Sequence, residues 1–286
     1  AAAIVPDAVL GVVGVVGMAG AVAVTGSLML FVYGVTQTTV VGWDSVQTAG
    51  CLSGSVVLML AFLVIEMRVR APLVPLNFFR NRTPAGANLV GFGVGTAVFG
   101  TFFLLSLYQQ HVLGFSALKT GIGYLAVSLT AIASASISQA LVTRFGVRPV
   151  LSSGLLVLGG GLVCFTQVSP DGSYVGDLLP GFLLTGVGIG ASFVPVSIAA
   201  LGGVTDKQAG LASGLINTSQ QVGGALGLAL MVTVANTRTE NLLQDGAELK
   251  AALSSGFGVA FYAAIAVICV AVGTTLVVMK RDDLCD

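Results

Sequence analysis

The sequence predicts an all-α polytopic membrane protein with eight transmembrane helices. The chain is 55% hydrophobic and only 8% charged, whereas a soluble domain carries about 25% charged residues. Its 286 residues divide into eight apolar stretches, and each is long enough for a helix of roughly 20 residues to cross a hydrocarbon core. The strands of a β-barrel would be about half as long and would alternate polar with apolar residues. The stretches show no such alternation.

Charged residues separate the eight stretches from one another. We expect the spans over residues 8–36, 46–65, 85–110, 117–142, 149–168, 178–201, 209–234 and 255–279. Helices are the expected conformation because a helix pairs its own backbone groups and leaves none unsatisfied in lipid. Between the last two spans, residues 236–253 are polar with leucines at a helical period, and we expect them at the outer surface.

Basic residues gather on one side of the predicted bundle. With eight spans both termini share a side, and nine of the 12 Lys and Arg residues fall on it: Arg68, Arg70, Arg80, Arg82, Arg144, Arg148, Lys207, Lys280 and Arg281. Lys119, Arg238 and Lys250 fall on the other side. Because basic loops stay in the cytoplasm, we expect a multi-pass protein of the plasma (inner) membrane with both termini cytoplasmic. The formal net charge of +0 offers no basic patch for nucleic acid.

A segment rich in proline and arginine separates the first two stretches from the last six. It reads RVRAPLVPLNFFRNRTP and contains three prolines and four arginines. We therefore divide the chain into two transmembrane helices in residues 1–66, a cytoplasmic linker in residues 67–84, and a six-helix bundle in residues 85–286.

The third stretch carries one face that is aromatic in the middle and polar at both ends. The face repeats at steps of four and three residues and consists of Asn88, Phe92, Gly95, Phe99, Phe102, Ser106 and Gln109. It is either a packing seam with Gly95 at the close contact, or the wall of a cavity for a bulky, mostly apolar solute. Amides are costly in lipid, so Asn88 and Gln109 should face protein or water.

The seventh stretch combines small residues with amides. One face holds Gly210, Ser213, Asn217, Gln221, Gly224 and Gly227, and Gly214 and Gly223 lie beside it. Small residues let membrane helices approach closely, and the amides favour a hydrated or hydrogen-bonded interior. Pro195 in the sixth stretch removes a backbone donor and should kink that helix.

Residues that carry enzyme chemistry are missing or isolated. His111 has no carboxylate or cysteine nearby, and the four cysteines are far apart. The glycine-rich strings lie inside apolar stretches and lack the Lys-Ser/Thr ending of a phosphate loop. We expect no enzyme activity, no cofactor and no metal. No Asp, Glu, Lys or Arg lies near the middle of a predicted span, so the chain supplies no clear proton-coupling group.

Several runs of sequence resemble one family of transporters. RAPLVPLNFFRNRT, followed by a span ending LLSLYQQHVLGFSALKTGIGYL, resembles the start of the C-terminal half of the fourteen-span drug:proton antiporters of the major facilitator superfamily. AGLASGLINTSQQVGGALGLAL resembles their penultimate helix, and the spacing of DLLPGFLLTGVGIGASFVP also matches. RFGVRP is similar to the superfamily's basic cytoplasmic loop and keeps Arg144, Gly146 and Arg148. Gln139 and Thr143 stand where a glycine and an acid are usual.

The resemblance implies a fold and an activity. The first two spans would be the central pair of the fourteen-span branch, and the last six would be a C-terminal bundle of two inverted three-helix repeats. An N-terminal six-helix bundle would complete the transporter, which would export bulky apolar or amphipathic drugs or antibiotics in exchange for protons by alternating access. The implied partners are therefore the lipid bilayer, a small-molecule substrate, protons and that missing N-terminal bundle.

The same resemblance makes the third span a cavity-lining helix, which favours the cavity over the seam. We expect substrate-binding residues at Asn88, Phe92, Phe99, Phe102, Gln109, Asn217 and Gln221, and helix packing at Gly210, Gly214, Gly223, Gly224 and Gly227. The chain begins AAAIVPD without Met, and we expect that it starts within a longer protein. A non-transporting remnant, or a membrane protein that assembles with a second polypeptide, is the alternative.

Overall fold

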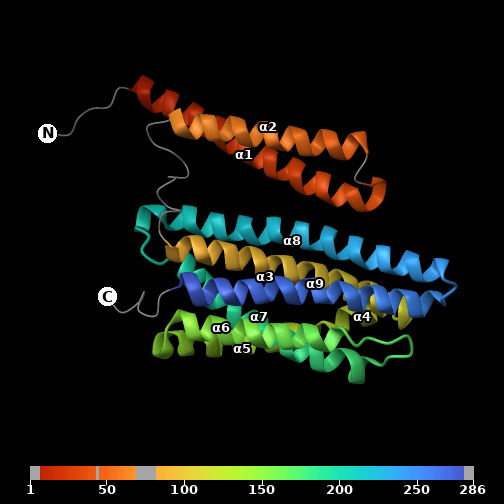
Figure 1. Ribbon diagram of the computed structural model, residues 1–286. Coiled ribbons are helices and arrows are strands. Elements are labelled where there is room, and N and C mark those ends of the chain that lie inside the picture. Colours follow the sequence, from red (N-terminus) through yellow and green to blue (C-terminus); the bar gives the residue numbers. More distant parts are fainter. Residues whose placement is uncertain (1–6, 43–44, 69–81, 280–286) are drawn as a thin grey trace. The chain divides into compact units, whose positions relative to one another are not determined.

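Helices make up almost all of the described chain. The structure, a computed structural model, describes residues 7–42, 45–68 and 82–279. Contacts within the chain divide it into two compact units, residues 1–80 and 81–286 (Figure 1). No β-strand occurs in the described ranges, and the predicted all-α class is confirmed.

The first unit is a pair of antiparallel helices. Helix α1 (Asp7–Val41) packs along α2 (Val46–Arg68), as Figure 1 shows. The hydroxyl of Ser27 on α1 donates a hydrogen bond of 2.8 Å to the carbonyl oxygen of Ser55 on α2. Both side chains are buried, so this bond satisfies polar groups inside an otherwise apolar contact.

The second unit contains the remaining helices. They are α3 (Arg82–Leu107), η2 (Tyr108–Val112), α4 (Ala117–Gly123), α5 (Leu125–Phe145), α6 (Val147–Phe165), η3 (Tyr174–Leu178), α7 (Leu179–Ala200), α8 (Asp206–Gln244) and α9 (Leu249–Val278). The elements η2 and η3 are single π-helical turns that extend α3 and precede α7. The expected fourth span is divided at Tyr124 into α4 and α5. Residues 236–253 are no separate helix, because they complete α8, turn at Gly246, and begin α9.

Each of the eight expected spans coincides with a helix or a pair of joined helices. Seven helical segments of the described chain are long and apolar enough to cross a membrane. The eighth, α8, is 39 residues long but is more polar, because glycines, serines and amides dilute its apolar residues. The membrane crossing of α8 therefore stays a prediction, while the polytopic class rests on the other seven.

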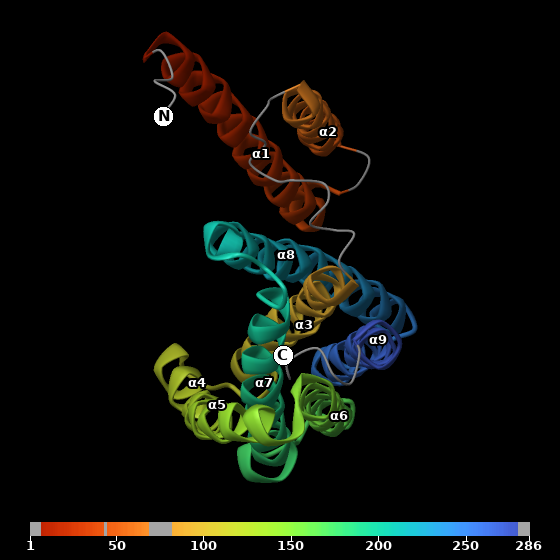
Figure 2. The ribbon, with the colours of Figure 1, turned by 90° about the vertical axis from the view of Figure 1, so that its left-hand side faces the viewer.

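Within the second unit, the helices pair in a pattern that occurs twice. Figure 2 shows α3 between α8 and α9, and α7 between α5 and α6. The order of contacting residues makes α3 parallel to α8 and α7 parallel to α5, while α9 and α6 run antiparallel to α3 and α7. The first helix of each three-helix set thus pairs with the second helix of the other set, which is the arrangement expected of two inverted repeats.

Pro195 lies inside α7 and leaves one carbonyl of that helix without its usual donor. Proline has no backbone N–H, so the carbonyl oxygen of Ala191, four residues earlier, receives no bond from position 195. The hydroxyl of Ser138 on α5 donates to that oxygen at 3.4 Å. A neighbouring helix thus supplies the missing donor, as tertiary structure commonly does for proline in membrane helices.

Candidate substrate-facing surface

Glycines on α3 and α8 pack against backbone carbonyl groups of the opposite helix. A Cβ atom on Gly223 would collide with the carbonyl oxygen of Phe92, and one on Gly227 would collide with that of Thr96. On α3, a Cβ on Gly95 would meet the carbonyl of Gln220. The hydroxyl of Thr96 donates to the carbonyl oxygen of Gly223 at 3.0 Å. We call this contact the α3–α8 seam; it allows no side chain at its glycines.

Asn88 belongs to the α3–α8 seam. Its side chain is 7% exposed, and its Nδ2 donates to the carbonyl oxygen of Pro84 at 2.8 Å. Its Oδ1 accepts a hydrogen bond of 2.9 Å from the hydroxyl of Ser219 on α8. The amide is therefore occupied on both sides by protein groups within this unit.

Gln109, at the other polar end of the predicted face, is completely buried. Its Nε2 donates to the carbonyl oxygen of Leu105 at 3.3 Å. Its Oε1 has no hydrogen-bond partner among the described residues and points toward Gly123 of α4, where it lies 2.9 Å from the position of a Cβ atom. Buried acceptors without a partner are uncommon, so a water or another donor is expected here.

The aromatic middle of α3 is open. Phe99 is 49% exposed and Phe103 is 43% exposed, whereas Phe92 and Phe102 are partly buried. With Leu89, which is also exposed, these side chains follow one stripe at helical spacing. The predicted face is thus accessible only in part: Asn88 and Gln109 at its ends are buried in the protein, whereas Phe99 in its centre is exposed.

Tyr124, at the break between α4 and α5, supports the aromatic face from the side. Its hydroxyl donates to the carbonyl oxygen of Phe102 at 2.6 Å and lies 3.0 Å from the hydroxyl of Ser106. The rings of Phe102 and Tyr124 meet edge to face, with centroids 5.4 Å apart. Sequence reasoning missed Tyr124 and Phe103, although a lone tyrosine in an apolar stretch was the available signal for the first.

Helix α8 presents a polar stripe that nothing in the described part of the second unit covers. Asn217 and Gln221 are exposed, and positions Gly210 and Gly214 have no atom within 4 Å of an added Cβ. The hydrogen bond that Asn217 donates within the described residues goes to the carbonyl oxygen of Ser213 in its own helix, at 2.8 Å. Exposed amides are costly in hydrocarbon, so this stripe is expected to face water or another protein segment.

The aromatic face and the polar stripe border each other. Gly224 lies seven residues after Asn217, hence on the same side of α8. A Cβ on Gly224, which is buried, would lie 2.8 Å from the ring of Phe99, so this ring packs against α8 one turn beyond the polar stripe. The predicted residues thus separate into two groups: Asn88, Gln109, Gly223 and Gly227 lie inside the unit, while Phe99, Asn217 and Gln221 form part of an open amphipathic surface.

The basic loop around Gly146 joins the end of α5 to the start of α6. Gly146 ends α5 with a φ of 83°, a conformation that favours glycine. Arg148, at the start of α6, donates from Nη2 to the carbonyl oxygen of Leu276 near the end of α9, at 2.6 Å. Arg144 is exposed and lies 5.3 Å from the centre of the Phe145 ring. A cation at a helix C-terminus is favourable, so Arg148 links α6 to α9 without the usual acid.

No group of three or more His, Cys, Asp and Glu side chains in the described part of the chain is arranged to hold a metal ion. The surface described above carries aromatic rings and amides. Such groups bind solutes by shape, stacking and hydrogen bonds.

Comparisons with known proteins point to transport. The sequence model of the Major Facilitator Superfamily matches residues 3–228. The chain is 33% identical to the puromycin resistance protein of Streptomyces alboniger over 81% of its own length and 46% of that protein's. It is 34% identical to the cephamycin export protein of Amycolatopsis lactamdurans, over 87% and 51% of the two lengths. The lincomycin resistance protein of Streptomyces lincolnensis is 30% identical over 77% and 45%. The chain thus spans about half the length of these relatives.

Proposed function

Because the chain belongs to the Major Facilitator Superfamily, we propose that it forms the C-terminal part of a transporter that exports bulky apolar or amphipathic compounds. Puromycin, cephamycin and lincomycin appear in the names of relatives, so substrates of the drug or antibiotic type are proposed. A second bundle of six helices completes the transporter. Export proceeds by alternating access, in which two bundles rock about a cavity between them.

The observation that carries this proposal is the contact between the ring of Phe99 and Gly224 of α8, one turn beyond the polar stripe. It brings exposed aromatic rings and exposed amides onto one continuous surface. Such a surface suits a solute with a large apolar body and a few polar groups, because stacking provides affinity and the amides of Asn217 and Gln221 provide orientation. Phe92 and Phe102 contribute the partly buried flank of the same wall.

Exchange for protons rests on the family resemblance. The acids in the described helices lie near helix ends, as Glu66 does in α2 and Asp177 does in η3. Proton transport through a membrane protein generally uses a titratable group inside the bilayer. We therefore assign the coupling carboxylate to the second bundle, and assign solute binding to the surface described here.

The two units receive different roles in this proposal. Residues 1–66 are the central helix pair, residues 67–84 are a cytoplasmic linker, and residues 85–286 are the transport bundle. The division found from internal contacts falls after residue 80, which lies inside the proposed linker. The protein resides in the plasma membrane with both termini in the cytoplasm, because most of its Lys and Arg residues lie on that side.

Transport into inverted membrane vesicles tests the function. Vesicles would carry either this chain or the chain extended upstream by six further spans, and uptake of a fluorescent amphipathic compound would be followed. The extended protein is expected to accumulate the compound when a proton gradient is imposed and to stop when a protonophore is added. Equal inactivity of both proteins, with the gradient present and both proteins correctly inserted, would contradict the proposal.

A second candidate is a membrane protein that does not transport by itself but assembles with a separate polypeptide. Like the first candidate it requires a second bundle, because the chain spans about half the length of each relative. Coexpression of this chain with a separately encoded six-span bundle distinguishes the two. Restored transport together with copurification supports assembly, whereas an active extended chain and an inactive pair supports the first proposal.

A further inference from the structure

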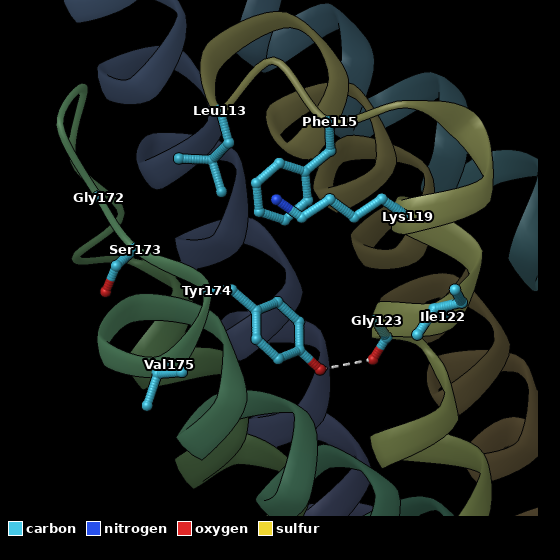
Figure 3. Close-up of a pocket in the computed structure, with 9 residues that line it drawn as sticks. All are labelled: Leu113, Phe115, Lys119, Ile122, Gly123, Gly172, Ser173, Tyr174 and Val175. Atoms are coloured by element: carbon cyan, nitrogen blue, oxygen red, sulfur yellow. Dashed lines mark hydrogen bonds between the residues drawn. The ribbon is translucent and has the colours of Figure 1, made fainter.

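A pocket of about 470 Å³ lies between α4 and η3, at the end of the second unit that carries loops 113–116 and 166–173 (Figure 3). Lys119 is the one charged residue among the nine that line it. Its Nζ lies 3.6 Å from the centre of the Phe115 ring, and this cation–π contact holds the ammonium group at the edge of the pocket.

Tyr174 forms the opposite wall of the pocket. Its hydroxyl donates a hydrogen bond of 2.7 Å to the carbonyl oxygen of Gly123 (Figure 3). A Cβ atom on Gly123 would lie only 3.0 Å from the Tyr174 ring, so the glycine allows the ring its position. The pocket therefore has a cation at one side and a fixed aromatic wall at the other.

Large apolar side chains surround the charged edge on the outside. Leu118, Ile122 and Val175 are all more than half exposed in the described chain, and Ile122 and Val175 also line the pocket. In a membrane protein such side chains face lipid tails, and a lysine near a helix end extends its ammonium group to the level of the head groups. We therefore expect the pocket to lie at the boundary between hydrocarbon and head groups.

We propose that this pocket binds one phospholipid molecule of the surrounding leaflet. The phosphate of the lipid meets the ammonium group of Lys119, and an acyl chain runs past Ile122 and Val175. Charge favours an anion, because no carboxylate lines the pocket. Two carboxylates adjoin the lining without belonging to it: Asp171 precedes Gly172 in the loop, and Asp177 of η3 accepts a hydrogen bond of 2.6 Å from the backbone N–H of Ser173.

Native mass spectrometry of the purified full chain with phosphatidylglycerol tests this proposal. Lys119→Gln is expected to lower the retained lipid about fivefold, the factor associated with one basic residue near an anionic lipid surface. Ile122→Trp is expected to lower it by filling the pocket. Lys250→Gln, which removes a lysine from the start of α9, and Leu118→Trp, which adds a ring outside the pocket, are the matched controls and should retain wild-type lipid. Lys119→Arg should restore binding, because it keeps the charge.

Competition experiments distinguish a bound phospholipid from free phosphate and from an exported solute. Soluble glycerol phosphate is expected not to displace the lipid, since it lacks the acyl chain; displacement at similar concentration would show a site for free phosphate and overturn the proposal. A fluorescent amphipathic cation that displaces the lipid and binds Lys119→Gln as well as wild type would assign the pocket to exported solute instead. Equal lipid retention by Lys119→Gln, Ile122→Trp and both controls would also overturn it.

Discussion

The hydroxyl of Ser219 on α8 donates a hydrogen bond of 2.9 Å to Oδ1 of Asn88 on α3, and this bond joins two residues that are 131 positions apart. It lies in the α3–α8 seam, next to glycines at which the two backbones touch. Two helices that touch only through glycines can shift along each other, because no side chain protrudes to hold their relative position. The polar pair, together with the bond from Thr96 to the carbonyl oxygen of Gly223, therefore restricts the register of the two parallel helices and with it the position of the Phe99 ring against Gly224.

Replacement of Asn88 by leucine is expected to destabilise the protein more than it impairs substrate binding. The bond to Ser219 is lost, and interhelical bonds of this kind contribute about 0.6 kcal/mol on average in membranes. A double-mutant cycle with Ser219→Ala, read by thermal unfolding in detergent, measures the coupling. Loss of transport at unchanged stability and zero coupling would instead assign Asn88 to the substrate.

Gly227→Ala is expected to lower stability by about 1–3 kcal/mol, the usual cost of an extra carbon in a filled contact. Its Cβ would collide with the backbone carbonyl of Thr96, which cannot rotate away. Gly214→Ala on the same helix is the control, because its Cβ meets nothing within 4 Å. That variant should be neutral or slightly more stable, since alanine favours helix by about 1 kcal/mol over glycine. Equal melting temperatures for the two variants would argue against the seam.

Arg148→Gln is expected to loosen the end of α9. The bond to the carbonyl oxygen of Leu276 is removed, together with a favourable charge at a helix C-terminus that is worth about 0.3–1 kcal/mol. Hydrogen exchange should rise in the last turn of α9 and remain unchanged in its middle. Arg144→Gln provides the comparison, because Arg144 is exposed and lies over the neighbouring Phe145 ring of its own helix. If both variants raised exchange alike, the loss of loop charge and not the specific bond would be responsible.

Asn217→Leu and Gln221→Leu are expected to reduce transport more than they reduce folding. Both side chains are exposed on α8, and the only described bond of Asn217 is to its own helix, so neither supports a packing contact in this unit. Efflux of a fluorescent drug from cells should fall severalfold while the amount of inserted protein stays constant. Gln139→Leu replaces an exposed amide on α5 and should leave efflux unchanged. A loss of insertion proportional to the loss of efflux would contradict a direct role.

Single cysteines placed at the two ends of the second unit test the orientation. In a background without the four natural cysteines, Thr143→Cys is expected to react with an impermeant maleimide only after the cells are opened. Ser116→Cys, close to Lys119, should react in intact cells. The expectation follows from the excess of basic residues around Arg144 and Arg148. Reaction at position 143 from outside would reverse the assigned topology.

Much of the fold could be predicted because the length of an apolar stretch strongly restricts the structure it can adopt in a bilayer. A stretch of about 20 apolar residues between charges has few alternatives to a spanning helix, and all eight expected stretches are helical. Details inside the helices were not predictable in this way. The break at Tyr124 and the π-helical turns η2 and η3 depend on contacts with neighbouring helices, which leave no hydrophobic signal in the sequence.

The candidate site could be predicted only in part. Periodicity placed Asn88, Phe99 and Gln109 on one face of α3, but it contains no information about which neighbour covers which end of that face. Gly210 and Gly227 are both glycines of α8, yet Gly210 has no atom within 4 Å of an added Cβ, whereas Gly227 touches the backbone of α3. Their difference arises from where α3 crosses α8.

The sequence alone determined that a lipid bilayer surrounds this protein, where its helices lie along the chain, and which residues share a helix face. These properties depend on local composition and spacing. Only the tertiary structure decided which polar residues are enclosed and which remain available. Asn88 is buried and bonded to Ser219 of α8, whereas Asn217 of α8 is exposed. The reason is physical: burial is a property of pairs of helices, and the close approach of α3 and α8 depends on glycines that are distant in the chain.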